Sequence, residues 1–180
     1  DMELAIENLR KSSGMKAAKK ASRVAADGVV RVAVANGVGT LLEVNSETDF
    51  VARDDNFLAF TDEVIAAAAA TELSDVDALM VGEMEERRSA LVQKIGENIT
   101  VRRMAKINAP IVGSYVHSNK RIGVLIGLEG GNAELAKDVA MHVAAVNPLV
   151  INPDDVDAEV IQKEKEIFIA QAENSGKSVE

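Results

Sequence analysis

The chain has 180 residues, of which 47% are hydrophobic and 27% charged, so it has enough apolar side chains to bury a core. Its 20 Lys and Arg are outnumbered by 29 Asp and Glu, and the net charge of −9 argues against a protein that mainly wraps a nucleic-acid backbone. The absence of Cys excludes disulfides, thiolate metal sites and thiol nucleophiles, and no apolar run approaches the length of a membrane span. We therefore expect a globular protein of a cytosol-like compartment, with no membrane and no direct nucleic-acid partner.

The N-terminal segment has the spacing of a helix. Its apolar residues at helical intervals are Met2, Ala5, Ile6 and Leu9. Since a short helix is marginal in water without a packing partner, we expect residues 1–26 to be the remnant of an N-terminal helical module with a basic linking helix. Residues 10–31 hold seven Lys and Arg against one acid, Asp27. This basic run is interpreted as a solvated face of the linking helix, with a docking strip for an acidic partner as the alternative.

A β-hairpin follows the basic run. Valines at positions 30, 32 and 34 alternate with their neighbours, residues 36–39 supply a turn, and residues 40–44 form the returning strand. After a polar stretch at residues 45–56, the pattern predicts an amphipathic helix over residues 57–70.

A second helix is expected in this part of the chain. It should start at Ser74, capped with the help of Asp77, and continue through Ile95 to an end at Gly96. A half-buried strand over residues 99–107 comes next.

The order of strand, strand and helix then occurs again. Residues 111–117 and 121–128 read as strands and residues 134–145 as a helix, which indicates a duplicated unit. We predict an α+β fold of two related subdomains, each an antiparallel sheet packed with helices, preceded by the remnant of the N-terminal helical module. The subdomains are expected at residues 27–108 and 109–180.

Two further features complete the predicted organisation. A final helix should start near residues 152–155, where Pro153 and neighbouring acids are typical of a first turn, and run toward residues 174–176. The two copies differ most in the link between the second strand and the helix, which is longer in the first copy, at residues 45–56. Function tends to lie in a loop that a repeated scaffold holds without depending on it.

The residues that carry enzyme chemistry are sparse. His117 and His142 have no metal-ligand spacing, and no phosphate-binding glycine motif occurs, so we expect no metal, no cofactor and no bound nucleotide. His142 is interpreted as a half-buried helical His and His117 as an exposed residue at a strand end, with a partner contact as its alternative. A small enzyme that uses Asp49 or His142 as a base is the least supported hypothesis, because no nucleophile with its base can be named.

The long loop carries the clearest functional signal. Phe50 is one of only five aromatic residues in the chain, which has four Phe and one Tyr. Two orientations stay open: Phe50 folds back over its own helix beside Phe57, or it is held out as an apolar wedge that enters a pocket of a partner.

Several motifs together resemble one family. Residues 45–53, with the sequence NSETDFVAR, resemble the TDFVAKN signature of bacterial elongation factor Ts, with Arg53 and Asp54 departing from that pattern. Further similar segments, in the same order, are AAKK at 17–20, AADG at 25–28, KIGEN at 94–98, Arg102 with Arg103, GSYVH at 113–117, RIGV at 121–124 and MHVAA at 141–145. The family usually continues past residue 180 with a helical hairpin and a return to the second subdomain, so the chain is expected to be a fragment.

The resemblance implies a non-enzymatic activity. The family promotes GDP release from the GTPase elongation factor Tu, so the implied partner is elongation factor Tu, GDP-bound or nucleotide-free, in a bacterial cytoplasm or, as the alternative, an organelle matrix. In the family the Phe of the loop inserts near the magnesium and phosphate site, which makes Phe50 the wedge and Asp49 its polar companion. A fragment that docks on the partner without competent exchange is the alternative. The partner-binding residues implied in this way are Thr48, Asp49, Phe50, Val51, Ile95, Gly96 and His117.

Overall fold

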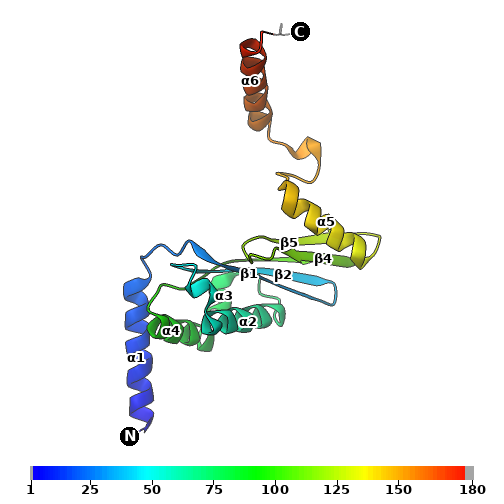
Figure 1. Cartoon of the computed structure of the whole chain (residues 1–180). Coiled ribbons are helices and arrows are strands. Elements are labelled where there is room, and N and C mark those ends of the chain that lie inside the picture. The colour runs from blue at the N-terminus through cyan, green and yellow to red at the C-terminus, as the bar shows by residue number, and fades with distance from the viewer. Residues whose placement is uncertain (1, 177–180) are drawn as a thin grey trace. The chain divides into compact units, whose positions relative to one another are not determined.

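The computed structural model describes residues 2–176, and its element order is drawn in Figure 1. The helices are α1 (Met2–Lys20), α2 (Asp55–Ala69), α3 (Val76–Leu79), α4 (Glu83–Ile95), α5 (Ala133–Val146) and α6 (Ala158–Asn174), with 3₁₀ turns η1 (Val51–Arg53) and η2 (Pro153–Asp155). The strands are β1 (Asp27–Ala35), β2 (Val38–Ser46), β3 (Thr100–Asn108), β4 (Ile111–Val116) and β5 (Gly123–Leu128).

The first sheet is built on the predicted hairpin. β1 and β2 pair antiparallel from Asp27 opposite Ser46 to Ala35 opposite Val38. The two residues between them, Asn36 and Gly37, both have positive φ, 52° and 76°, which matches the right-handed twist of the strands. β3 pairs antiparallel with the other edge of β2, so the strand order is β1-β2-β3.

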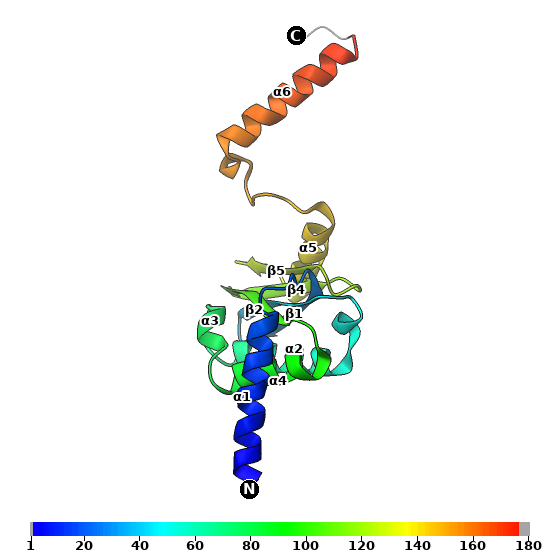
Figure 2. The same cartoon turned by 90° about the vertical axis from the view of Figure 1, so that its left-hand side faces the viewer.

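The two sheets of the first unit pack face to face. α2 lies against one face of the first sheet, and the antiparallel pair β4-β5 lies against the other (Figure 1 and Figure 2). A side chain at Gly123 of β5 would come within 2.7 Å of Leu41 on β2, so the sheets approach too closely there for a Cβ atom. α5 covers the outer face of β4 equally closely, because a Cβ at Gly113 would lie 2.5 Å from the backbone of Ala136.

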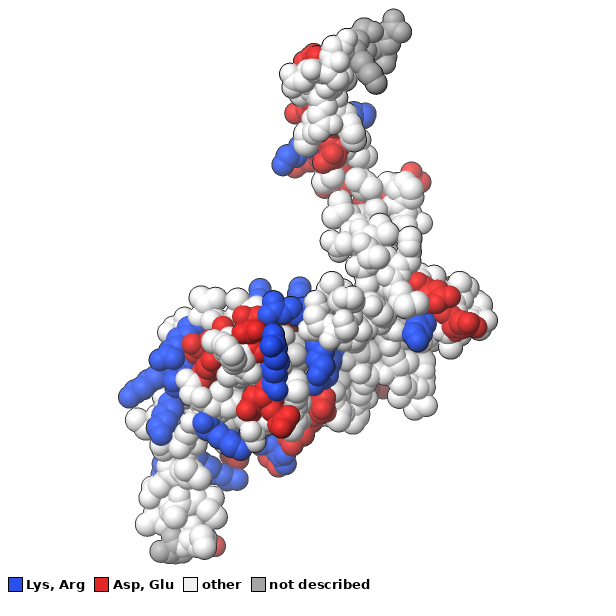
Figure 3. Space-filling view, viewed as in Figure 1, with Lys and Arg blue, Asp and Glu red and all other residues white. Residues whose placement is uncertain are grey.

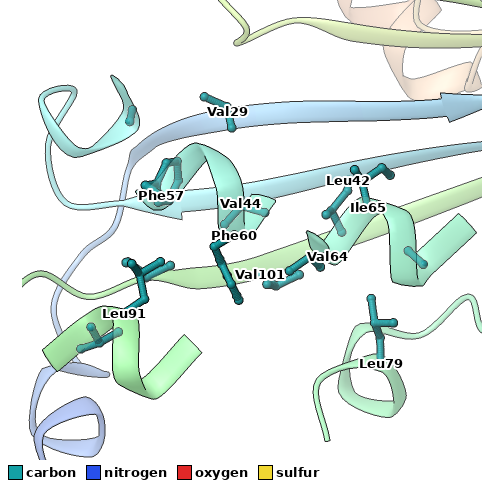
Figure 4. Packing of buried hydrophobic residues seen from close by; sticks show 14 of the residues in the cluster. Val29, Leu42, Val44, Phe57, Phe60, Val64, Ile65, Leu79, Leu91 and Val101 are labelled. Carbon is teal, nitrogen blue, oxygen red and sulfur yellow. The ribbon is translucent and has the colours of Figure 1, made fainter. Parts of the chain in front are cut away.

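The hydrophobic core lies between the first sheet and its helices. The buried side of α2 is formed by Phe57, Phe60 and Val64, which face Val44 of β2 and Val101 of β3 (Figure 4). Alternate residues of β2 at positions 40, 42 and 44 are all buried, as expected for a strand with one face on a core. The helical periodicity of α2 and the alternation along β2 thus place their buried residues in the same core.

α1 joins this core through its second half. Ala17 is buried and Ser13 donates a hydrogen bond to the Gln93 side chain of α4, whereas the apolar residues at the start of α1 are exposed. The basic run of residues 10–31 is tied mostly to acids of the same chain, as with Arg10–Glu86 (3.1 Å). On the face drawn in Figure 3, basic side chains lie among acidic ones. This favours the solvated face over the docking strip.

Two predicted helix starts are wrong. The helix expected from Ser74 to Ile95 is broken in two, because Asp75 rather than Ser74 caps the one-turn α3 and Gly82 adopts a φ of 58° before α4. The final helix begins at Ala158, where the side chain of Asp157 accepts from the Glu159 N–H. The acids near Pro153 form only the turn η2.

Two compact units make up the chain, one ending at Ala145 and one beginning at Val146. The second unit holds η2 and α6, and no described residue of α6 is buried. The α+β class with a leading helix and two antiparallel sheets is confirmed. The predicted boundaries of residues 1–26, 27–108 and 109–180 stay a prediction, and residues 1 and 177–180 lie outside the described part.

Candidate functional site

Four segments of the first unit meet at one end of the first sheet. Since Asp27 pairs with Ser46 and Asn45 pairs with Thr100, the start of β1, the end of β2 and the start of β3 share this end. The linker before β1, the loop after β2 and the segment before β3 therefore converge there. The turn between β4 and β5 is held at the same place, because the Val30 N–H donates to the Lys120 carbonyl over 2.7 Å.

The loop after β2 is folded back on itself. The Ser46 hydroxyl donates to the Thr48 carbonyl over 3.0 Å, and the Ala52 N–H donates to the same carbonyl over 3.2 Å. The 3₁₀ turn η1 follows, in which the Arg53 N–H donates to the Phe50 carbonyl over 3.2 Å. Ala52 is buried and Val51 packs against the core. Val51 and Ala52 thus anchor the loop on the core, and Phe50, the residue before them, stays on the outer side of the loop.

Phe50 is the exposed apolar residue of this loop. Its exposed fraction is 81%, whereas Phe57, the first aromatic residue of α2, is completely buried. Of the two orientations left open by the sequence, the structure has the one in which Phe50 points away from its own helix. The Phe50 side chain is therefore accessible for contact with another molecule.

The polar residues beside Phe50 are engaged within the loop. The Asp49 carboxylate accepts from the Arg53 guanidinium at 2.9 Å, four residues along the chain. The Thr48 hydroxyl donates to Glu97 at 2.7 Å and therefore points inward. The loop thus presents one large apolar side chain with an ion pair beside it.

The loop ends at a capped helix. The Asp54 carboxylate accepts from the backbone N–H of Asn56 at 2.9 Å and of Phe57 at 3.2 Å, which caps the N-terminus of α2. The pKa of Asp54 lies below the ordinary carboxyl value, chiefly because the Asn56 side chain donates to the carboxylate and secondly because the Phe57 N–H does. Asp54 therefore acts as a structural cap.

Ile95 and Gly96 lie where α4 ends. Ile95 is half-buried against the core, and Gly96 has a left-handed φ of 89° that closes the helix through a hydrogen bond from its N–H to Val92. The Gly96 carbonyl accepts from the Lys20 ammonium at the end of α1. The end of α4 is thus fixed from the N-terminal helix.

Two carboxylates that sequence reasoning did not single out join this segment to the loop. Glu97 Oε2 accepts from the backbone N–H groups of Glu47 (3.1 Å) and Thr48 (3.0 Å), while Glu47 Oε1 accepts from the Asn98 N–H at 2.6 Å. The Asn98 side chain in turn donates to the Arg23 carbonyl of the linker at 2.8 Å. We call this reciprocal arrangement the Glu47–Glu97 clamp. Glu97 lies inside the KIGEN segment, whose resemblance to the family was the sequence signal that could have identified this residue.

The histidines are both on the surface. His117, at the end of β4, is exposed as predicted, and its Nδ1 lies 2.9 Å from the Tyr115 hydroxyl. His142, predicted to be half-buried, is exposed on α5, because α5 packs through Ala136 and Ala140 rather than through that face. The turn after His117 joins the first sheet through an ion pair between Arg121 and Asp27.

Comparison with known protein families identifies the family of the chain. The family profile described as Elongation factor TS matches residues 47–180, which include the loop, the end of α4, the clamp and His117. The chain belongs to the elongation factor Ts family. All the predicted partner-binding residues lie inside the matched range.

Individual relatives are similar along the whole chain. Elongation factor Ts of Hahella chejuensis is 62% identical over 182 residues, which cover 100% of this chain and 64% of that protein. The proteins of the same name from Cellvibrio japonicus and Marinobacter nauticus are 60% and 59% identical, again over 100% of this chain, and it covers 63% of each. The chain thus spans somewhat less than two thirds of the length of these relatives.

A hollow also lies at this end of the sheet. The cavity, of about 530 Å³, is lined among others by Asp27, Arg121 and Arg103. Two of these side chains pair with each other, Arg121 with Asp27, and Arg103 pairs with Glu43 at 2.5 Å, so their charges are already neutralised. Among residues 2–176 there is no group of three His, Cys, Asp or Glu placed to hold a metal ion, and no helix long and apolar enough to cross a membrane.

Proposed function

We propose that this chain is the core of a guanine-nucleotide exchange factor that promotes GDP release from elongation factor Tu, with Phe50 as an inserted wedge. The observation that carries the proposal is Phe50 itself, which is 81% exposed on a loop anchored at both ends. Membership of the elongation factor Ts family supplies the partner. The proposed reaction needs no catalytic group in this chain, which agrees with a site made of one aromatic side chain and backbone contacts.

The physical basis is thermodynamic linkage. If the chain binds nucleotide-free elongation factor Tu more tightly than the GDP-bound form, GDP must bind the complex more weakly by the same factor. A wedge that displaces magnesium ligands or phosphate-binding N–H groups removes contacts of about 1.5–3 kcal/mol each, so the loss of two accelerates release by orders of magnitude. Exchange then follows from contact alone.

The other site residues take supporting roles in this proposal. Asp49 and Thr48 shape the loop around Phe50, and Val51 seats it on the core. Ile95 and Gly96 form a second contact at the end of α4 on the same end of the sheet, and exposed His117 forms a third from the second sheet. Only Phe50 presents a large apolar surface, so it should dominate the energy of the contact.

We also infer that the two arrangements of two strands and a helix are related subdomains. β1, β2 and α2 repeat in the order of β4, β5 and α5, and both hairpins are antiparallel. In this view the subdomains extend over residues 27–108 and 109–180, after a segment of a helical module at residues 1–26. The proposed setting is the bacterial cytoplasm, where the relatives' translation function belongs.

The test is the release of fluorescent GDP from elongation factor Tu, chased with excess unlabelled GDP, with and without the 180-residue chain. We expect acceleration by the wild-type chain and its loss in Phe50→Ala. The matched control is Phe168→Ala on α6, because Phe168 is also exposed, at 65%, but lies outside the site.

The outcomes separate the hypotheses. If the chain binds elongation factor Tu but does not accelerate GDP release, the exchange hypothesis is refuted. The alternative from the sequence, a fragment that docks without competent exchange, would then take its place. No binding at all would refute the proposed function for this chain. Equal loss in Phe50→Ala and Phe168→Ala would refute the wedge.

A further inference from the structure

We propose that Glu97 is a positioning residue that holds Phe50 in its exposed orientation, an inference that rests on the proposed exchange function. Glu97 touches neither Phe50 nor, in the proposal, elongation factor Tu. Its carboxylate instead binds the entry of the loop through three donors, the N–H groups of Glu47 and Thr48 and the Thr48 hydroxyl, over 3.1, 3.0 and 2.7 Å.

The position of these donors explains why Glu97 controls the wedge. Thr48 is also the residue whose carbonyl accepts from the Ser46 hydroxyl and from the N–H of Ala52, a residue of η1. Its hydroxyl oxygen also accepts from the Val51 N–H, with 3.4 Å between the two heavy atoms. A displacement of Thr48 therefore moves both sides of Phe50, which has little buried surface of its own to hold it.

The clamp also couples the two proposed contacts with the partner. Gly96 immediately precedes Glu97, and its carbonyl is held by Lys20, so the carboxylate that fixes the loop is attached to the end of α4. Glu47 returns the interaction by accepting from the Asn98 N–H. Because carboxylates bind N–H groups more strongly than neutral acceptors do, this pair is a stiff link between segments distant in sequence.

The exchange assay tests this with matched variants. At saturating chain, Glu97→Ala should lower the maximal rate of GDP release about tenfold while the half-saturating concentration changes less than about threefold, because the docking surface stays intact. Glu97→Gln should retain activity within about threefold, since its amide oxygen can accept from the same N–H groups. The control is Glu43→Ala, which removes a half-buried carboxylate of β2 whose ion-pair partners are Arg102 and Arg103 of β3 and not residues of the loop.

A double-variant cycle isolates the interaction. If the Thr48 hydroxyl acts through Glu97, adding Thr48→Val to Glu97→Ala should cause little further loss. Additive losses would overturn the assignment, and so would a Glu97→Ala variant with the wild-type rate. A fall in Tm with a proportional loss of binding would also overturn it, because that result marks a merely structural role.

A second readout does not depend on exchange activity. In the free chain, backbone order parameters of residues 48–51 should fall in Glu97→Ala, and the amides of Glu47 and Thr48 should exchange with solvent faster, with amides of β1 unchanged. If the wild-type chain does not accelerate GDP release from elongation factor Tu, the proposed function is refuted. The measurement of loop order still tests whether Glu97 holds the loop. Unchanged loop order in Glu97→Ala would refute the positioning role.

Discussion

Replacing Phe50 and Phe57 by Ala makes the same chemical change at two nearby positions and should have opposite effects on stability and exchange. Phe57 is completely buried at the start of α2, so its truncation leaves a cavity and should cost about 3–5 kcal/mol. For a chain of this size, that corresponds to a fall in Tm of roughly 6–20 °C. Phe50 is 81% exposed, so only about a fifth of its side chain gains from folding, or about 0.5 kcal/mol.

The exchange effect runs the other way. If the exposed four fifths of Phe50 enters a pocket of elongation factor Tu, its burial is worth about 1–2.5 kcal/mol, so Phe50→Ala should slow catalysed GDP release roughly 5- to 60-fold. Phe57→Ala, assayed well below its reduced Tm, should lose less, because it leaves the exposed aromatic residue in place. Phe57→Leu serves as a milder variant if Phe57→Ala does not fold.

Thermal unfolding followed by circular dichroism and the fluorescent GDP chase give the two numbers for each variant. The reasoning fails if Phe50→Ala destabilises the fold as much as Phe57→Ala does. It also fails if the Phe50→Ala variant accelerates GDP release from elongation factor Tu as much as the wild-type chain does. Either result would mean that the exposure of Phe50 is not the feature that separates the two residues.

Three other predictions concern the scaffold. Gly113→Ala should lower the free energy of unfolding in urea by about 1–3 kcal/mol, because its Cβ would meet Ala136 at 2.5 Å. The control Gly130→Ala should be near neutral, because no atom lies within 4 Å of its Cβ. Equal effects of the two variants would contradict the close packing of α5. Asp54→Ala should lower Tm at neutral pH. Since the folded pKa of Asp54 is depressed, the Tm difference between the wild-type chain and the variant should be full above about pH 5 and shrink as pH falls below about 4. A Tm difference that does not change with pH would rule out the charged cap. Gly96→Ala should cost about 1–2 kcal/mol from its φ of 89° alone, and an unchanged Tm would show that α4 ends differently.

The sequence predicted the parts of the fold that depend on local patterns. Asn36-Gly37 between two alternating runs is sufficient to predict the β1–β2 hairpin, because few other residues adopt positive φ in succession. The helical period from Phe57 to Ala68 predicts α2 for a similar reason. Where two local signals compete, as Ser74 and Asp75 do for one cap, the sequence does not decide between them.

The site was predictable in its members and not in its geometry. The resemblance to the family named Phe50, but its exposure depends on how Val51 and Ala52 pack beneath it, which has no periodic signature in a loop. The Glu47–Glu97 clamp was missed because each carboxylate stands beside polar neighbours and nothing local indicates its distant partner. His142 shows the reverse error, since an Ala- and Val-rich helix does not reveal which of its faces is covered.

The distance along the chain between the two sides of the clamp has a consequence for synthesis. Thr48 and Glu97 are 49 residues apart, and the β2–β3 pairing that brings them together spans a similar length, whereas the hairpin before them closes across two residues. At about 5–20 residues per second, the loop leaves the ribosome several seconds before its anchor exists. During that interval an apolar aromatic residue lies on an untethered segment of the nascent chain. The loop that we propose as the contact with the partner is therefore synthesised before the carboxylate that positions it, and its aromatic residue is open to a premature encounter during that interval.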